Sequence, residues 1–193
     1  MKIKFIVMTS EDPKRIENVQ KMEIPDLVIY RGDNDDVFQK YLNCFILESE
    51  YDGVLVLEDD VQLCWDFYTK VLGIIQKYAS DVISFFEKPN SRQVLEKGFR
   101  PGRDFMFNQC NYYPKATCEL FLGSENVAEF KNSYFTKYKV WVAPIDIYIA
   151  HVLSKYKLEY LMYLPFLVQH LPFKSILGNR STKRQTKFFI DDL

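Results

Sequence analysis

The stretch that most constrains the fold of this chain is residues 53–60, which read GVLVLEDD. Four large apolar residues in a row, without polar alternation, are typical of a β-strand that is buried on both faces, as in a central parallel strand covered by helices. Three acidic residues follow this strand directly. We therefore expect the acids at the carboxyl edge of the sheet, where open α/β sheets bind their ligands.

The three adjacent carboxylates indicate a cation site. Neighbouring carboxylates repel one another unless a cation or strong hydrogen-bond donors neutralise them. Mg²⁺ and Mn²⁺ prefer oxygen ligands and are commonly bound by one or two carboxylates together with substrate phosphates. We expect Asp60, with Glu58 or Asp59, to hold such an ion, and in an extended segment Glu58 and Asp60 would point to one side and Asp59 to the other. The alternative is a strand that ends in a solvated acidic turn.

The spacing of apolar residues predicts an α/β fold with a mostly parallel central sheet flanked by helices. In the first 86 residues strands are expected at 2–8, at 26–30, from Gly53 and at 81–86, with helices from Pro13, at 37–50 and at 65–78. Residues 87–114 lack clear periodicity and are expected to form a functional loop. Beyond this loop, the pattern predicts strands at 116–122 and 160–168 and helices at 124–138 and 147–157.

Composition fits a single globular domain. The chain has 193 residues, of which 48% are hydrophobic and 26% charged, enough for one large core. A net charge of −1 argues against stable nucleic-acid binding, and no glycine-rich phosphate loop is found. No signal peptide or membrane-spanning apolar segment is found, so we expect a cytoplasmic protein or one peripheral to a membrane. Cysteine spacing excludes the common zinc motifs and leaves a bridge between Cys110 and Cys118 open.

Two segments carry a resemblance to a known family. Residues 57–61, LEDDV, resemble the acidic motif of nucleotide-sugar-dependent glycosyltransferases with the GT-A fold, and residues 164–170, LPFLVQH, resemble a segment near the end of several such enzymes, with Phe166 in place of a small residue. The resemblance implies a small single-domain GT-A member, of a size that would suit a viral genome. Residues 1–86 would form its nucleotide-binding half, residues 87–173 its acceptor-side half and residues 174–193 a basic tail.

The resemblance also implies an activity, the metal-dependent transfer of a sugar from a nucleotide-diphosphate sugar, most simply a UDP-sugar, to a glycan, protein or lipid. Mn²⁺ or Mg²⁺ would be held by Glu58, Asp60 and His170, and Asp146 in the first turn of a helix would act as general base. The donor would rest on the first strand-to-helix turn, with the basic tail beside its diphosphate. The candidate donor-binding residues are Thr9, Ser10, Arg15, Asp33, Asp59, Lys174, Ser175 and Arg180.

Other interpretations of the same residues stay open. A nucleotidyltransferase uses similar carboxylates, but it needs a second set of acids and a phosphate-binding glycine loop that the sequence does not show. A degenerate transferase fold could bind a nucleotide or a sugar without catalysis. Asp146 could simply stabilise its helix, His170 could be a structural polar residue, and the tail cations could be a solvated patch.

Overall fold

The computed structural model describes residues 1–31, 37–86, 98–106, 108–138, 144–171, 173 and 189. Its strands are β1 (Ile3–Thr9), β2 (Val28–Arg31), β3 (Gly53–Glu58), β4 (Val61–Leu63), β5 (Val82–Ser84), β6 (Gly98–Pro101), β7 (Cys110–Pro114), β8 (Glu159–Met162) and β9 (Val168–His170). Its helices are α1 (Pro13–Gln20), α2 (Val37–Cys44), α3 (Phe67–Lys77), the short 3-10 helix η2 (Gly102–Asp104), α4 (Lys115–Leu122), α5 (Ser124–Tyr138) and α6 (Ile145–Lys155).

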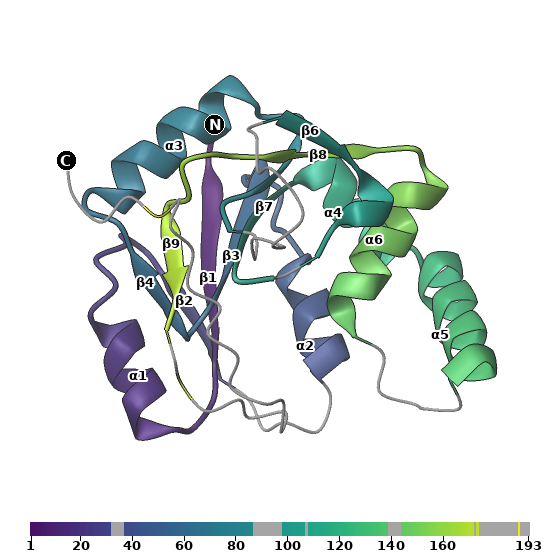
Figure 1. Ribbon diagram of the computed structural model, residues 1–193, viewed down its shortest axis with the longest axis horizontal. Coiled ribbons are helices and arrows are strands. Elements are labelled where there is room, and N and C mark those ends of the chain that lie inside the picture. The colour runs from purple at the N-terminus through teal and green to yellow at the C-terminus, as the bar shows by residue number, and fades with distance from the viewer. Residues whose placement is uncertain are drawn as a thin grey trace.

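These elements form one α/β domain around a seven-stranded sheet with the strand order β2-β1-β3-β7-β5-β8-β6 (Figure 1). Strand β1 is parallel to β2 and β3, and β5 is parallel to β8. Strand β7 is antiparallel to both of its neighbours, β3 and β5, and β6 is antiparallel to β8. Five of the seven strands (β2, β1, β3, β5 and β8) therefore point in one direction, so the sheet is mostly parallel, as the sequence predicts. A separate two-stranded ribbon pairs β4 with β9.

Strand β3 lies in the middle of the core, as its unbroken apolar run predicts. All four residues from Val54 to Leu57 are fully buried, at 0% exposure. Leu55 and Leu57 pack with α1 and α3 on one face of the sheet, whereas Val54 and Val56 pack with α2, α4 and α6 on the other. Figure 1 shows these two helical layers on opposite sides of the sheet. Burial on both faces accounts for the absence of polar residues from β3 before Glu58.

The middle of the chain differs from the sequence-based prediction. Residues 116–122, predicted as a strand, form the helix α4, and the strand at this point is instead β7, which lies in the predicted loop. Strand β6 also lies inside that loop. Residues 110–122 are largely apolar, so no period of two or 3.6 separates strand from helix, and Pro114 marks the boundary as the residue before the first helical turn.

Several boundaries also differ. The predicted helix at 37–50 ends at Cys44, and the helix predicted at 147–157 covers 145–155. The predicted last strand at 160–168 is two short strands, β8 and β9, separated by Pro165, which has no amide hydrogen to donate to a ladder. The helix predicted at 124–138 is confirmed as α5.

Two further expectations concern cysteines and membranes. All four cysteines are buried and free, so Cys110 and Cys118 are not bridged. Among the described residues, none of the helices has the length and apolar character that crossing a membrane requires.

Candidate functional site

The three acids meet other polar groups at one edge of the sheet. Strand β1 ends at Thr9 and the parallel strand β3 ends at Glu58. Strand β7 runs the opposite way and begins at this edge, where Cys110 pairs with Leu57, so Gln109 lies beside Glu58. The β4–β9 ribbon adds His170, which pairs with Val61. The carboxyl edge therefore brings together chain segments that are up to about 160 residues apart.

Asp59 is held from several sides by the first strand and helix. Thr9 donates its hydroxyl to Oδ2 of Asp59 at 3.0 Å, and the backbone N–H of Ser10 donates to the same oxygen at 3.1 Å. The guanidinium of Arg15 on α1 contacts the other oxygen, Oδ1. Asn18, one turn further along α1, donates to the backbone carbonyls of Asp59 at 2.8 Å and of Val61 at 2.9 Å. Both carboxylate oxygens are thus occupied, so Asp59 fixes α1 to the end of β3.

Burial is the main electrostatic influence on Asp59. It raises the pKa of this carboxyl because the charged form loses its hydration. The guanidinium of Arg15 and the donors from Ser10 and Thr9 oppose this rise in the pKa, whereas the Asp60 carboxylate adds to it. Arg15 compensates the buried charge of Asp59 through their ion pair. The Arg15 side chain is itself only 6% exposed, so both charges of the pair are buried.

Asp60 and His170 form a second, less complete pair. Oδ2 of Asp60 lies 3.4 Å from Nε2 of His170 and 3.5 Å from a guanidinium nitrogen of Arg15. Within the described part of the chain, Oδ1 of Asp60 and Nδ1 of His170 are buried and have no hydrogen-bond partner. Buried polar atoms without partners are costly, and native sites usually satisfy them with water, an ion or a ligand. An oxygen and an imidazole nitrogen are both donors that Mn²⁺ accepts.

Asp59 and Asp60 do not follow the alternation expected of an extended strand. Strand β3 ends at Glu58, and the chain turns at Asp59 and Asp60, so both of these carboxylates reach Arg15. Glu58, in contrast, accepts a hydrogen bond from the side-chain amide of Gln109 at 3.1 Å. Over the described ranges, no three His, Cys, Asp or Glu side chains are placed to hold a metal ion together. The structure thus offers Asp60 and His170 as a pair, without Glu58 as a third member.

The remaining predicted residues fall into two groups. Asp146 lies in the first turn of α6, where its Oδ1 accepts a hydrogen bond from the N–H of Ile147 at 2.9 Å, a position that also stabilises the helix dipole. Its role as a base stays a prediction. Outside the described residues lie Asp33, Lys174, Ser175 and Arg180.

Three polar residues at this edge escape the sequence-based prediction. Asn18 lies three residues after Arg15 on α1. Residues with this spacing lie on the same face of a helix, so the sequence could have indicated that Asn18 and Arg15 contact the same segment. Asn108 and Gln109 are 6% and 3% exposed, and the oxygen of each side-chain amide is buried without a hydrogen-bond partner in the described chain. No sequence signal pointed to these two amides, because β7 itself was not predicted.

Comparisons with known proteins give a distant structural likeness. No protein-family model matches the chain, and no curated protein matches it in sequence. Among solved structures, the chain resembles TarS residues 1–349 from S. aureus, with 12% sequence identity and a TM-score of 0.48. The superposition covers 84% of this chain and 58% of that chain. This likeness is too distant to carry an argument about activity.

Proposed function

We propose that this protein is a metal-dependent glycosyltransferase that uses a nucleotide-diphosphate sugar as its donor. The observation that carries the proposal is the Asp60–His170 pair, whose buried oxygen and nitrogen have no hydrogen-bond partner in the described chain. The pair lies at the carboxyl edge of a mostly parallel sheet, where α/β proteins bind nucleotides. The LEDDV and LPFLVQH segments, which supply these two residues, are also those that resemble the GT-A enzymes.

Asp60 and His170 fit a divalent ion that is coordinated partly by the protein and partly by the substrate. One carboxylate and one imidazole leave most coordination positions for diphosphate oxygens and water, which is how Mg²⁺ and Mn²⁺ are commonly bound beside phosphates. An ion held by Asp60 and His170 would supply positive charge beside the departing nucleoside diphosphate. Asp59 would not join it, because Arg15, Thr9 and Ser10 already occupy its oxygens.

Other residues of the chain position the two substrates in this proposal. Thr9 and Ser10 form the first strand-to-helix turn, beside which the nucleotide lies, and α1 is fixed there through Arg15 and Asn18. Asp146, in the first turn of α6, takes the proton from the acceptor hydroxyl. Direct displacement with such a base inverts the configuration of the anomeric carbon.

The test is a calorimetric titration of the full chain with UDP, GDP, CMP and ADP, each with and without Mn²⁺. One nucleotide should bind in a Mn²⁺-dependent manner, and Asp60→Ala and His170→Ala should each weaken this binding about tenfold or more. Glu119→Ala, which removes an exposed carboxylate on α4, is the control and should bind like the wild type. Binding that needs no metal and survives Asp60→Ala would instead identify a non-catalytic nucleotide-binding module.

A further inference from the structure

Two buried amide side chains at the carboxyl edge of the sheet have oxygens without partners. Asn108 and Gln109, which lie directly before β7, are 6% and 3% exposed. Within the described chain, Oδ1 of Asn108 and Oε1 of Gln109 have no hydrogen-bond partner. Native proteins rarely leave buried polar atoms unsatisfied, because such atoms have lost their hydration and gained nothing in return. The two oxygens are therefore candidates for contact with a ligand or with ordered water.

Neighbouring residues hold both amides in place. Nε2 of Gln109 donates to Oε2 of Glu58 at 3.1 Å, and the backbone N–H of Glu58 donates to the carbonyl oxygen of Gln109 at 3.0 Å. Because an ionised carboxylate only accepts hydrogen bonds, the nitrogen of the Gln109 amide must face Glu58, and the oxygen is the atom left over. The hydroxyl of Tyr41 on α2 donates to the backbone carbonyl of Asn108 at 3.2 Å. The segment before β7 is thus anchored to β3 and to α2, independently of the two amide oxygens.

The amides lie within reach of the candidate metal pair. In the sheet, β3 lies between β1 and β7. Strand β3 ends at Glu58, and Asp60 follows two residues later, so their α-carbons are at most about 7 Å apart. Strand β1 leads to the turn at Thr9 and Ser10, on the other side of β3. A donor with its nucleotide at this turn and its diphosphate beside Asp60 would therefore place its sugar over the start of β7.

The same face of the sheet carries the helix of the candidate base. Val56 of β3 packs in one core cluster with Tyr41 of α2 and with Ile145, the first residue of α6. Side chains alternate along a strand, so Glu58, two residues after Val56, belongs to this face as well. Asp146 directly follows Ile145. A sugar beside Glu58 and Gln109 would thus lie on the side of the sheet where α6 begins.

The chemistry of the two amide oxygens favours hydroxyl groups as their partners. An amide oxygen accepts hydrogen bonds and cannot donate them, so it selects a ligand group that donates. Phosphate oxygens at neutral pH only accept, and here they would also meet the carboxylate of Glu58, so a diphosphate does not suit this position. A sugar carries several hydroxyls, each of which can donate one hydrogen bond to an amide oxygen.

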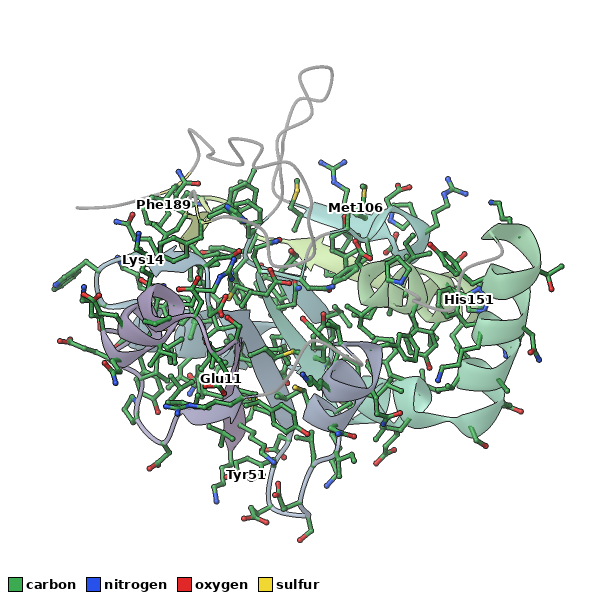
Figure 2. The ribbon with its side chains drawn as sticks, turned by 90° about the horizontal axis from the view of Figure 1, so that it is seen from below. Glu11, Lys14, Tyr51, Met106, His151 and Phe189 are labelled. Carbon is green, nitrogen blue, oxygen red and sulfur yellow. The ribbon has the colours of Figure 1, made fainter. Side chains whose placement is uncertain are left out.

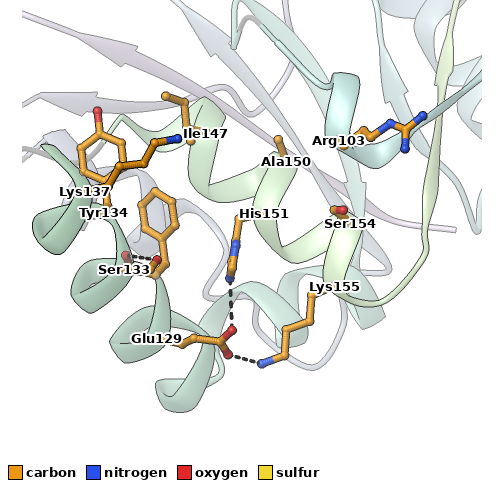
Figure 3. A pocket seen from close by; sticks show the side chains of 11 residues that line it. Arg103, Glu129, Ser133, Tyr134, Lys137, Ile147, Ala150, His151, Ser154 and Lys155 are labelled. Carbon is orange, nitrogen blue, oxygen red and sulfur yellow. Dashed lines mark hydrogen bonds and ion pairs between the residues drawn. The ribbon is translucent and has the colours of Figure 1, made fainter.

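A groove elsewhere on the surface is less suited to the transferred sugar. Figure 2 shows His151, which lines this groove, and Lys14, on α1, at opposite ends of the molecule. The groove lies between α5 and α6 and has a volume of about 620 Å³ (Figure 3). Glu129, a carboxylate in its lining, accepts from Lys155 at 2.6 Å. A ligand in the groove would lie away from the turn that leads into α1, whereas the amides lie beside Glu58.

We propose that Asn108 and Gln109 bind the sugar of the donor, and that each amide oxygen accepts a hydrogen bond from one sugar hydroxyl. The inference rests on the proposed function, since only a nucleotide-diphosphate sugar places a sugar beside the Asp60–His170 pair. It makes the segment before β7 a determinant of sugar specificity, because a sugar that lacks a hydroxyl at the matching position leaves a buried acceptor without a partner.

The experiment is calorimetric titration of the full chain, in the presence of Mn²⁺, with UDP-glucose, UDP-galactose, UDP-N-acetylglucosamine and GDP-mannose. UDP and GDP are titrated in parallel. The nucleotide sugar that binds most tightly is then compared with analogues in which one sugar hydroxyl is replaced by fluorine. Fluorine cannot donate a hydrogen bond, so the replacement of a hydroxyl that contacts an amide oxygen should weaken binding about threefold to tenfold. Replacement at the other positions should change little.

Two variants and one control assign the contacts. Asn108→Leu and Gln109→Met each remove an amide and roughly keep its size. Each should weaken binding of the nucleotide sugar about threefold to tenfold and leave binding of the nucleotide alone unchanged. In each variant, the sensitive fluorinated analogue should bind as well as the natural sugar, because the contact is already lost. Gln76→Met removes an exposed amide on α3 and should change nothing. If a variant does not fold, as judged by circular dichroism, the fluorine series in the wild type decides.

Three results would overturn the sugar site alone. Equal binding of the whole fluorine series by the wild type would mean that ordered water satisfies the two oxygens. An equal loss of nucleotide and nucleotide-sugar binding in Gln109→Met would assign the amide to the metal or nucleotide site. Binding of UDP or GDP without binding of any of the four nucleotide sugars would leave the amides without a sugar. In all three, the wild type still binds a nucleotide with Mn²⁺, as the proposed function requires. A wild type that binds no nucleotide contradicts the proposed function, and the sugar site with it.

Discussion

Arg15 on α1 forms an ion pair with Asp59 at the end of β3, and the two side chains are buried to 6% and 5% exposure. The residues are 44 positions apart, and each belongs to a segment that forms the candidate site. A buried ion pair of this kind adds little net stability compared with an apolar pair, but it makes the fold depend on both partners. The arrangement therefore links the geometry of the candidate site to the docking of α1.

Replacing Arg15 should reveal this dependence. Arg15→Met keeps an unbranched apolar stem but leaves Asp59 buried without its cation, so we expect the free energy of unfolding to fall by about 3 to 5 kcal/mol. Urea denaturation at pH 7 measures the change. Lys21→Met removes a cation from the exposed pair with Glu17 near the end of the same helix and should leave the urea midpoint almost unchanged. Equal effects of the two variants would contradict a structural role for Arg15.

The part of the fold that could be predicted from the sequence differs from the part of the site that could be. The run from Val54 to Leu57 predicts a doubly buried strand because a strand covered by helices on both faces has no polar side. The burial of β3 confirms this, although β3 is parallel only to β1 and is antiparallel to β7. The boundary between β7 and α4 could not be predicted, since its position depends on pairing with β3 and β5, whose residues are distant in the sequence.

The site shows the same division between local and long-range information. That Thr9 and Asp59 lie at one edge follows from strand direction alone, but the contact of Arg15 with Asp59 depends on how α1 packs. Gln109 reaches Glu58 only because β7 enters the sheet antiparallel to β3. This strand pairing was not predicted from the sequence. It gives the Glu58 carboxylate a hydrogen bond from Gln109, whereas the sequence predicts that Glu58 and Asp60 hold one metal ion together.

Stability should fall at alkaline pH because thiols and phenols are buried. Burial raises the pKa of Cys44 from its ordinary value near 9.0 to about 12, and it also raises the pKa values of Cys110 and Tyr113. Between pH 9 and 12 the folded state keeps protons that the unfolded state releases, so the free energy of unfolding decreases as pH rises. Each such thiol contributes up to about 1.4 kcal/mol per pH unit.

Urea denaturation between pH 7 and pH 10 tests this expectation. Cys44→Ala removes one of the shifted groups, so its stability should fall less steeply with pH than that of the wild type, even if its stability at pH 7 is lower. At pH 8 the four buried thiols should react with a thiol reagent only as fast as the protein unfolds. A slope that is the same with and without Cys44 would contradict the proposed origin of the pH dependence.

Two glycines should respond to alanine in opposite directions. A Cβ at Gly53, the first residue of β3, would lie 2.6 Å from a ring carbon of Tyr112 and 2.7 Å from the carbonyl oxygen of Tyr113. Because this carbonyl belongs to the neighbouring strand and cannot move freely, Gly53→Ala should cost about 2 kcal/mol or more. Gly73 lies within α3 with open space around its Cβ position, so Gly73→Ala should add about 0.5 to 1 kcal/mol. Thermal unfolding measures both changes: the midpoint temperature should fall in Gly53→Ala and rise in Gly73→Ala.

The two acids on either side of Asp59 should differ in their importance for metal binding. Asp60 has a buried oxygen without a hydrogen-bond partner in the described chain and lies beside His170, whereas the carboxylate of Glu58 accepts from Gln109. Asp60→Asn and Glu58→Gln each remove one charge and preserve the size of the side chain. We expect Asp60→Asn to weaken Mn²⁺-dependent nucleotide binding about tenfold or more, and Glu58→Gln to change it less than about threefold. Calorimetry at several Mn²⁺ concentrations measures both effects. An equal loss in the two variants would mean that Glu58 leaves Gln109 to coordinate the ion when the nucleotide binds, and it would restore the three-ligand arrangement that the sequence predicts.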